Sequence, residues 1–176
     1  APDAASGAAQ IEDVDALDAA SSAAQIEIAR SHFQRGVSLY RSGAYDAAFA
    51  EFARAHESAP HHRILYNLAQ VQAQRHDYVE ALALFQRYLD EGGSNVPEPR
   101  AQEVRTEMAE LRRRVSRLRV DTNVDDARLF INGLPAGALP RDEPLLLNAG
   151  IHRVRVEKPG YLGAARVVTL AGGEES

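Results

Sequence analysis

Cysteine and tryptophan are absent from this chain of 176 residues, and lysine occurs once, at Lys158. Without cysteine the sequence has no disulfide, no thiol nucleophile, no thiolate metal ligand and no cysteine to carry a lipid. It also lacks any run of 18 or more apolar residues, so it predicts no membrane-spanning helix. We expect a protein that is soluble in the form given, with a core drawn from its 45% hydrophobic content.

Charge is unevenly spread along the chain. Its 20 basic and 25 acidic residues give a formal net charge of -5, which offers no reason to expect nucleic acid as the partner. Residues 1–27 contain six acidic residues and no basic one, in a background of alanine, serine and glycine. This composition is typical of a solvated, disordered tail, which we place at residues 1–21.

From residue 22 onward the spacing of apolar residues predicts helices. Apolar side chains recur at steps of three and four residues from Ile26 to Tyr40, which places them along one stripe of a helix. A Ser-Gly pair then interrupts the pattern, and a second helix is predicted over residues 45–57. Pro60 closes this helix, so the two helices form an antiparallel pair.

The helical pair recurs after 33 residues. A repeat of this length predicts stacked helical hairpins, because small residues let two helices approach closely while aromatic residues fill the space between hairpins. The recurrence consists of Tyr45, Ala48 and Phe52, which are repeated as Tyr78, Ala81 and Phe85.

The repeat resembles that of the tetratricopeptide-repeat (TPR) family, which has Gly-x-x-[Leu/Tyr] on its first helix and Tyr-x-x-Ala-x-x-x-Phe with a closing proline on its second. The second repeat departs from the pattern at Ala69 and His76, which replace glycines, and Gly93 stands near the missing proline. The resemblance implies an α-solenoid whose first helices line a binding groove. The matching residues are Gly36, Leu39, Tyr45, Ala48, Phe52, Ala55 and Pro60, then Tyr66, Asn67, Leu68, Tyr78, Ala81 and Phe85.

The groove that the TPR resemblance implies combines aromatic area, arginine side chains and amides. This mixture suits an acidic or extended peptide, because arginine pairs with carboxylates and amides bond a peptide backbone. An alternative is that Phe33 and Tyr66 pack inside the array. The predicted groove residues are Arg30, Phe33, Val37, Tyr40 and Arg41 from the first repeat and Arg63, Tyr66, Asn67, Gln70 and Gln74 from the second.

Two repeats bury too little apolar surface for a stable solenoid, so a further element must cover the open end. Residues 99–119 predict a helix whose apolar residues follow a 3-4-3-4-3 spacing and form one seam. We assign it as a capping helix that completes a TPR array over residues 22–118. Its excess of arginine makes binding of phosphates or anionic lipid one alternative to a solvated face. Self-association is another, through the seam residues Val104, Met108, Leu111 and Val115.

Beyond Leu118 the apolar pattern changes from helical to alternating, and glycine and proline become frequent, which marks a domain boundary. Turns are predicted at Asn132-Gly133 and Ala149-Gly150, because glycine adopts positive φ without a steric penalty. The predicted strands span residues 117–122, 128–132, 145–147, 152–157 and 166–170.

This β half resembles a PEGA domain. The most specific part is the run Gly150 to Tyr161, which contains Gly-x-His-x-Val-x-Val and Lys-Pro-Gly-Tyr. Two further motifs support the resemblance, Phe-Ile-Asn-Gly at 130–133 and Pro-x-Gly at 135–137. Residues 124–127 read Val-Asp-Asp-Ala where the family has Pro-Glu-Gly-Ala. The resemblance implies a small antiparallel, β-sandwich-like module over residues 119–173, of the kind found on exported and envelope-associated bacterial proteins.

No pattern typical of catalysis or metal binding is evident. His61 and His62 are adjacent, and adjacent residues rarely chelate one metal ion well. The other histidines have no serine, cysteine or carboxylate at a recognisable catalytic spacing, and the two Gly-Gly pairs lack the pattern of a phosphate-binding loop. We therefore expect no catalytic residues, no metal, no cofactor and no enzymatic activity.

The sequence thus predicts an α + β protein with two segregated domains, TPR hairpins with a capping helix followed by the PEGA-like domain. We expect a non-enzymatic protein–protein interaction scaffold that is periplasmic or associated with the bacterial cell envelope, and whose groove binds a partner protein. The alternative is a structural protein that binds cell-wall or surface polymer through the PEGA-like domain.

Overall fold

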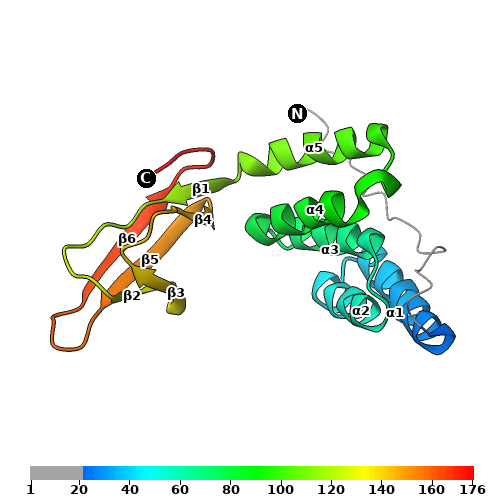
Figure 1. The fold of residues 1–176 in the computed structure, drawn as a ribbon, viewed down its shortest axis with the longest axis horizontal. Coiled ribbons are helices and arrows are strands. Elements are labelled where there is room, and N and C mark those ends of the chain that lie inside the picture. The colour runs from blue at the N-terminus through cyan, green and yellow to red at the C-terminus, as the bar shows by residue number, and fades with distance from the viewer. Residues whose placement is uncertain (1–21) are drawn as a thin grey trace. The chain divides into compact units, whose positions relative to one another are not determined.

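The chain forms two compact units in a computed structural model that describes residues 22–176. One unit reaches to Met108 and the other runs from Ala109 to Ser176. The predicted tail, residues 1–21, lies outside the described residues. Helices precede strands along the chain (Figure 1), so the predicted α + β class with segregated elements is confirmed.

The described helices form two antiparallel hairpins and one further helix. The first hairpin consists of α1 and α2, the second of α3 and α4, and α2 packs against α3. The bounds are α1 Ala23–Arg41, α2 Tyr45–Ser58, α3 His62–Gln74, α4 Tyr78–Gly92, a short 3₁₀ helix η1 Gly93–Asn95, and α5 Glu98–Arg112.

Local sequence signals account for where these helices begin and turn. α1 begins at a capping box, in which the Ser22 hydroxyl accepts the Gln25 N–H at 3.3 Å and the Gln25 side chain accepts the Ser22 N–H at 3.1 Å. Gly43 and His76 stand at equivalent places in the two hairpin turns, and both have positive φ, +78° and +61°. The repeat therefore extends to the turn, where a histidine adopts a conformation that glycine takes at lower cost.

The two hairpins also share their internal packing. The rings of Phe33 and Phe52 lie 5.3 Å apart in the first hairpin, and those of Tyr66 and Phe85 lie 5.5 Å apart in the second. A Cβ atom on Gly36 would lie 2.8 Å from the Phe52 ring, so the glycine is required for α1 to approach α2. Each ring of the second pair lies 33 residues after its counterpart in the first pair, which shows one structural unit used twice.

Helix α5 packs against α3 and covers it. The Arg100 guanidinium lies 4.3 Å from the centre of the Tyr66 ring, and the Gln70 amide donates to both Glu107 carboxylate oxygens at 2.8 and 3.0 Å. The run Ile64–Gln72 of α3 is buried without interruption, and Val104 of α5 is fully buried. α3 therefore lies in the interior of the helical unit.

The predicted helix over residues 99–119 is too long. α5 ends at Arg112, and Val115–Leu118 form a strand whose Val115 and Leu118 side chains are buried in the β unit. The predicted seam of Val104, Met108, Leu111 and Val115 therefore does not lie along one helix. A short apolar run fits the spacing of a helix or that of a strand, and here the pairing of β1 with β4 makes the run a strand.

The β unit has two antiparallel sheets. One pairs β1 with β4, and the other has the strand order β3-β2-β5-β6. Residues Glu174–Ser176 run parallel beside β1, since the Arg117 N–H donates to the Glu174 carbonyl at 2.9 Å. The bounds are β1 Val115–Leu118, β2 Ala127–Ile131, β3 Leu134–Leu139, β4 Leu145–Asn148, β5 Gly150–Glu157 and β6 Ala164–Leu170.

Four predicted strands agree with β2, β4, β5 and β6 to within two residues at each end, but β3 was not predicted. Pro135 and Gly137 disfavour a strand in the sequence. β3 tolerates them because it lies at the edge of its sheet, where the register shifts opposite Leu129 and Phe130 and Gly137 adopts a φ of +104°.

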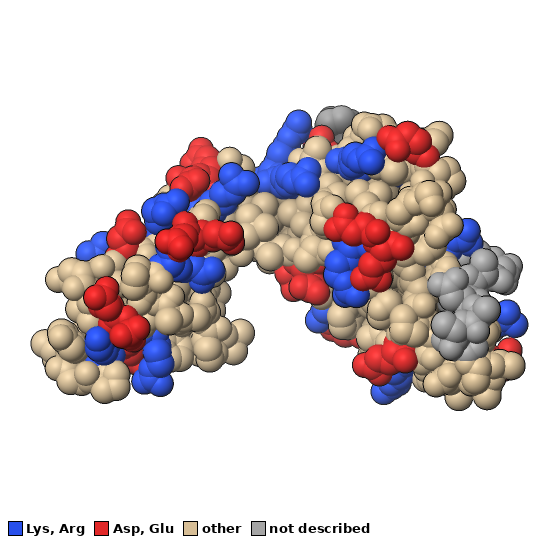
Figure 2. All heavy atoms as spheres, in the orientation of Figure 1, with Lys and Arg blue, Asp and Glu red and all other residues tan. Residues whose placement is uncertain are grey.

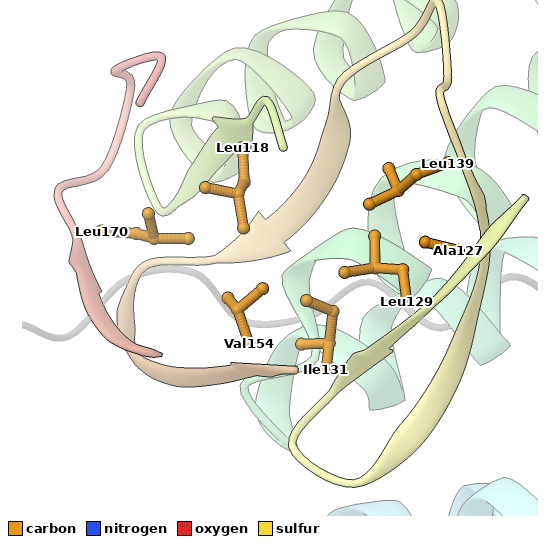
Figure 3. Close-up of a cluster of buried hydrophobic side chains, with 7 residues drawn as sticks. All are labelled: Leu118, Ala127, Leu129, Ile131, Leu139, Val154 and Leu170. Carbon is orange, nitrogen blue, oxygen red and sulfur yellow. The ribbon is translucent and has the colours of Figure 1, made fainter. Parts of the chain in front are cut away.

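The core of the β unit lies between its two sheets. Leu118 of β1 faces side chains from the four-stranded sheet, and Figure 3 shows these side chains pointing toward one another. Burial of these apolar groups is the main stabilising contribution to a unit of this size, which has no disulfide. The cluster consists of Leu118, Ala127, Leu129, Ile131, Leu139, Val154 and Leu170.

Candidate protein-binding site

The predicted groove residues divide into a covered set and an open set. On α3, Tyr66, Asn67 and Gln70 are buried, Arg63 is partly buried and Gln74 is exposed. On α1, Phe33 is buried against Phe52. The remaining α1 residues of the prediction are Arg30, Val37 and Tyr40, which are partly buried, and Arg41, which is exposed.

The polar side chains of α3 are satisfied within the helical unit. The Asn67 amide donates to the Arg63 carbonyl at 3.2 Å, and Gln70 donates to Tyr66 and to Glu107. The Tyr66 ring also packs 5.4 Å from the ring of Tyr88. These side chains stabilise the packing of α3, and α5 occupies the surface over them.

Tyr40 of α1 is a partly exposed residue of the predicted groove. Its ring lies 5.5 Å from that of Tyr45, and burial raises its pKa to about 12, an effect that a hydrogen bond with Gln74 opposes. The negative charge of Glu107 contributes to the same rise. Gln74 lies one turn after Gln70 on α3, and Gln70 donates to Glu107 of α5. We call the surface that carries Tyr40, Gln74 and Glu107 the α1–α3–α5 face.

Glu107 was not among the predicted groove residues. Burial raises the pKa of its carboxyl group, and the Gln70 amide and the Arg100 charge lower it again. Arg100, Val104 and Glu107 follow each other at steps of four and three residues, so they share one stripe of α5. That spacing in the sequence could have indicated Glu107, but the prediction for this helix rested on its apolar residues alone.

Two basic side chains flank the α1–α3–α5 face. Arg30 pairs with the exposed Glu27 at 3.4 Å, whereas Arg41 has no ion-pair partner among the residues that the structure describes. A guanidinium in this state is free to pair with a carboxylate of a ligand. The face thus combines aromatic area, an amide and an available positive charge.

The most concentrated ionic contacts of the helical unit join α1 to α2. Glu51 accepts a hydrogen bond from His32 at 2.8 Å and pairs with Arg35 at 3.1 Å and Arg54 at 2.8 Å. The hydrogen bond with His32, followed by the charges of these arginines, lowers the pKa of Glu51. Glu51 of α2 therefore links its helix to α1 through His32 and Arg35.

Metal-binding geometry is not found in the described part of the chain. No group of three or more His, Cys, Asp or Glu side chains within residues 22–176 is placed to hold a metal ion. The rings of His61 and His62 stack at 4.3 Å, and His62 also faces Tyr88. Asp125 and Asp126 lie in a turn, where the Asp125 carbonyl accepts a hydrogen bond from Lys158 at 2.7 Å.

The arginines of α5 are largely paired with acidic residues of the same helix. On the face shown in Figure 2, acidic and basic side chains occur in small interleaved groups. Among the described residues, no helix is long and apolar enough to span a membrane. The pairs within α5 are Arg100–Glu103 at 2.9 Å and Arg105–Glu98 at 2.8 Å, and Arg113, directly after the helix, pairs with Glu110 at 3.0 Å.

The β unit presents a basic and aromatic surface on its four-stranded sheet. Phe130 of β2 lies between two arginines, with the Arg155 guanidinium 4.5 Å and the Arg128 guanidinium 6.0 Å from the ring centre. A hollow of about 420 Å³ lies beside them, lined by Asn132, Gly133, Arg153 and Arg155. Sequence reasoning missed this surface because β2 and β5 bring its residues together from distant parts of the chain.

The segment from Val115 to Ser176 contains all six strands and the residues that pair with β1. Residues 115–176 match the PEGA domain family. The predicted PEGA-like module is thereby confirmed, and it begins four residues before the predicted start at 119. The match suggests a surface-related or envelope-related protein-binding role. The match does not include the helices α1 to α5, so their TPR character stays a prediction. No curated protein matches the chain.

Proposed function

We propose that this protein is a non-enzymatic scaffold of the bacterial cell envelope, in which the α1–α3–α5 face binds a partner protein and the PEGA unit provides a second attachment. The observation that carries the proposal is that α3 links the first helix of the other hairpin to α5, because Gln74 bonds Tyr40 of α1 and Gln70, one turn earlier, bonds Glu107 of α5. Helical repeats bind partners through such shared surfaces.

The chemistry of the open part of this face favours a partner segment that carries carboxylates. Arg41 is exposed and has no ion-pair partner among the described residues, and Arg30 is held only by an exposed glutamate. Surface pairs of this kind contribute little to stability, so a ligand carboxylate replaces the glutamate at small cost. Val37 and Tyr40 supply apolar and aromatic contact between the two charges.

Charge reversal tests this proposal. Full-length protein with Arg30→Glu and Arg41→Glu, the unchanged protein and an Arg105→Glu control would each be used to capture partners from the envelope fraction of the source cells. Arg105 is an exposed arginine of α5 whose partner is the exposed Glu98. We expect a protein that the unchanged chain and the control retain and the double variant loses. Equal recovery by all three would contradict binding at this face.

A second candidate function is binding of an anionic surface polymer by the PEGA unit. It is favoured by the arrangement of Arg128, Arg153 and Arg155 around the partly exposed Phe130, because arginine pairs with carboxylates or phosphates while the ring contacts a sugar face. The Arg153→Glu variant separates the two functions, since it should reduce co-sedimentation with cell-wall material and leave partner capture by the helical unit unchanged.

A further inference from the structure

The two edges of the four-stranded sheet differ in how well they resist pairing with another strand. The β3 edge contains Pro135 and a register shift, and both are devices that block strand addition. The β6 edge, Ala164–Leu170, is seven residues long, contains no proline and carries one charge, Arg166. No described residue pairs with the outer side of β6, so its backbone groups there are available for hydrogen bonds.

A hollow of about 470 Å³ lies against the same strand. Its apolar lining includes Val154 and Val156 of β5 and Val168 of β6, and the segment Leu118–Asn123 also lines it. Side chains of a strand added beside β6 would alternate between the two faces of the sheet, so every second one would point toward this hollow. Specificity in strand addition arises from such pockets.

The charges around β6 favour an acidic ligand. Arg166 of β6 and Arg153, which is directly opposite Val167 on β5, have no ion-pair partner among the residues described. Arg119 also lines the hollow, where Asp121 is the one acidic side chain within the described chain. Val167 is 69% exposed. Valine is short, which lets a long side chain of an added strand reach over it toward Arg153.

We propose that β6 accepts an extended, acidic peptide segment of a partner protein as an additional strand, with one of its apolar side chains in the hollow. The backbone hydrogen bonds supply affinity, while Arg153, on the face opposite the hollow, selects carboxylates. This site belongs to the PEGA unit and does not depend on the binding proposed for the α1–α3–α5 face. A second copy of this chain fits less well, because pairing two β6 strands would bring basic side chains together without neutralising them.

The probe for this site is a fluorescent peptide of alternating valine and glutamate, titrated into the full chain at low salt and followed by anisotropy. A peptide with lysine in place of glutamate serves as its comparison. We expect the glutamate peptide to bind and Arg153→Glu to weaken it about tenfold, the loss typical of one charged hydrogen bond. Arg105→Glu, which changes an exposed arginine of the helical unit, should leave the affinity unchanged.

Hydrogen exchange locates the bound peptide and guards against an effect of the variants on folding. In the unchanged chain, the amides of β6 should become protected when the glutamate peptide is added, while those of β3 should not. Absence of binding, equal binding of the lysine peptide, or protection outside β6 would each overturn the proposal. Protection of β6 without peptide that rises with protein concentration would also overturn it, in favour of a second copy.

Discussion

At the scale of single residues, the pKa of the Glu107 carboxyl group is shifted by its environment in the helical unit. It is partly buried between α5 and α3, where it accepts two hydrogen bonds from one amide nitrogen of Gln70. Burial raises its pKa above the ordinary value, despite the opposing effects of Gln70 and Arg100. The folded protein therefore binds a proton at this site more tightly than the unfolded chain does.

A glutamine at this position should make the protein more stable at neutral pH. The raised pKa of Glu107 means that its contribution to stability is fully present below the unfolded pKa and is lost as pH rises through the folded pKa. Glu107→Gln keeps an oxygen acceptor for Gln70 and removes the charge. Urea unfolding should show a gain for the variant at pH 7 that shrinks at pH 4.

The matched control for this prediction is Glu57→Gln, an exposed carboxylate on α2. Its unfolding free energy should change little, and by the same amount at both pH values. A Glu107→Gln variant that is less stable than the unchanged protein at pH 7 would show that the carboxylate charge stabilises the contact between α3 and α5.

At the scale of elements, the segment after β6 completes the smaller sheet. Gly173 donates its N–H to the Val115 carbonyl at 2.7 Å, and residues Glu174–Ser176 then run parallel to β1. Gly172 lies so close to the turn before β1 that a Cβ atom on it would be 2.0 Å from the Arg113 carbonyl oxygen. The close approach of two backbones makes glycine necessary here.

The substitution Gly172→Ala should therefore destabilise the β unit. We expect a loss of about 1–3 kcal/mol in the free energy of unfolding, since the contact is with backbone atoms that cannot rotate away. Gly163→Ala is the control, because its Cβ atom would meet its nearest neighbour at an ordinary 3.5 Å. Equal urea midpoints for the two variants would show that the C-terminal segment does not need this approach.

At the scale of the whole molecule, the chain divides into two compact units, each with its own packing. The helical unit depends on the paired rings of two hairpins, and the β unit on the cluster around Leu129. Such units are expected to unfold in separate cooperative steps.

Calorimetry of the full chain should accordingly show two unfolding transitions. Gly36→Ala, which places a Cβ atom 2.8 Å from the Phe52 ring, should lower one transition by several degrees. Gly172→Ala should lower the other and leave the first unchanged. A single transition that both substitutions shift together would show that the two units unfold as one.

Prediction from sequence succeeded where the determining residues are close together in the chain. The stripe from Ile26 to Tyr40, the Ser-Gly turn and the 33-residue recurrence predicted both hairpins, and the run Gly150–Tyr161 predicted the PEGA domain. It failed for β3, since Pro135 and Gly137 are acceptable only at a sheet edge. It also placed Val115 and Leu118 on a helix, because neither the position of β4 nor that of the β core is visible in their spacing.

The sequence by itself determined the order of helices and strands, the repeated aromatic pairs and the family of the β unit, because periodicity and turn residues act over a few positions. Only the tertiary structure decided which surfaces stay open. It placed α5 over Tyr66 and Gln70, joined Tyr40 to Gln74, and left β6 as a sheet edge beside a hollow. These features depend on contacts between residues far apart in the chain, which local patterns do not encode.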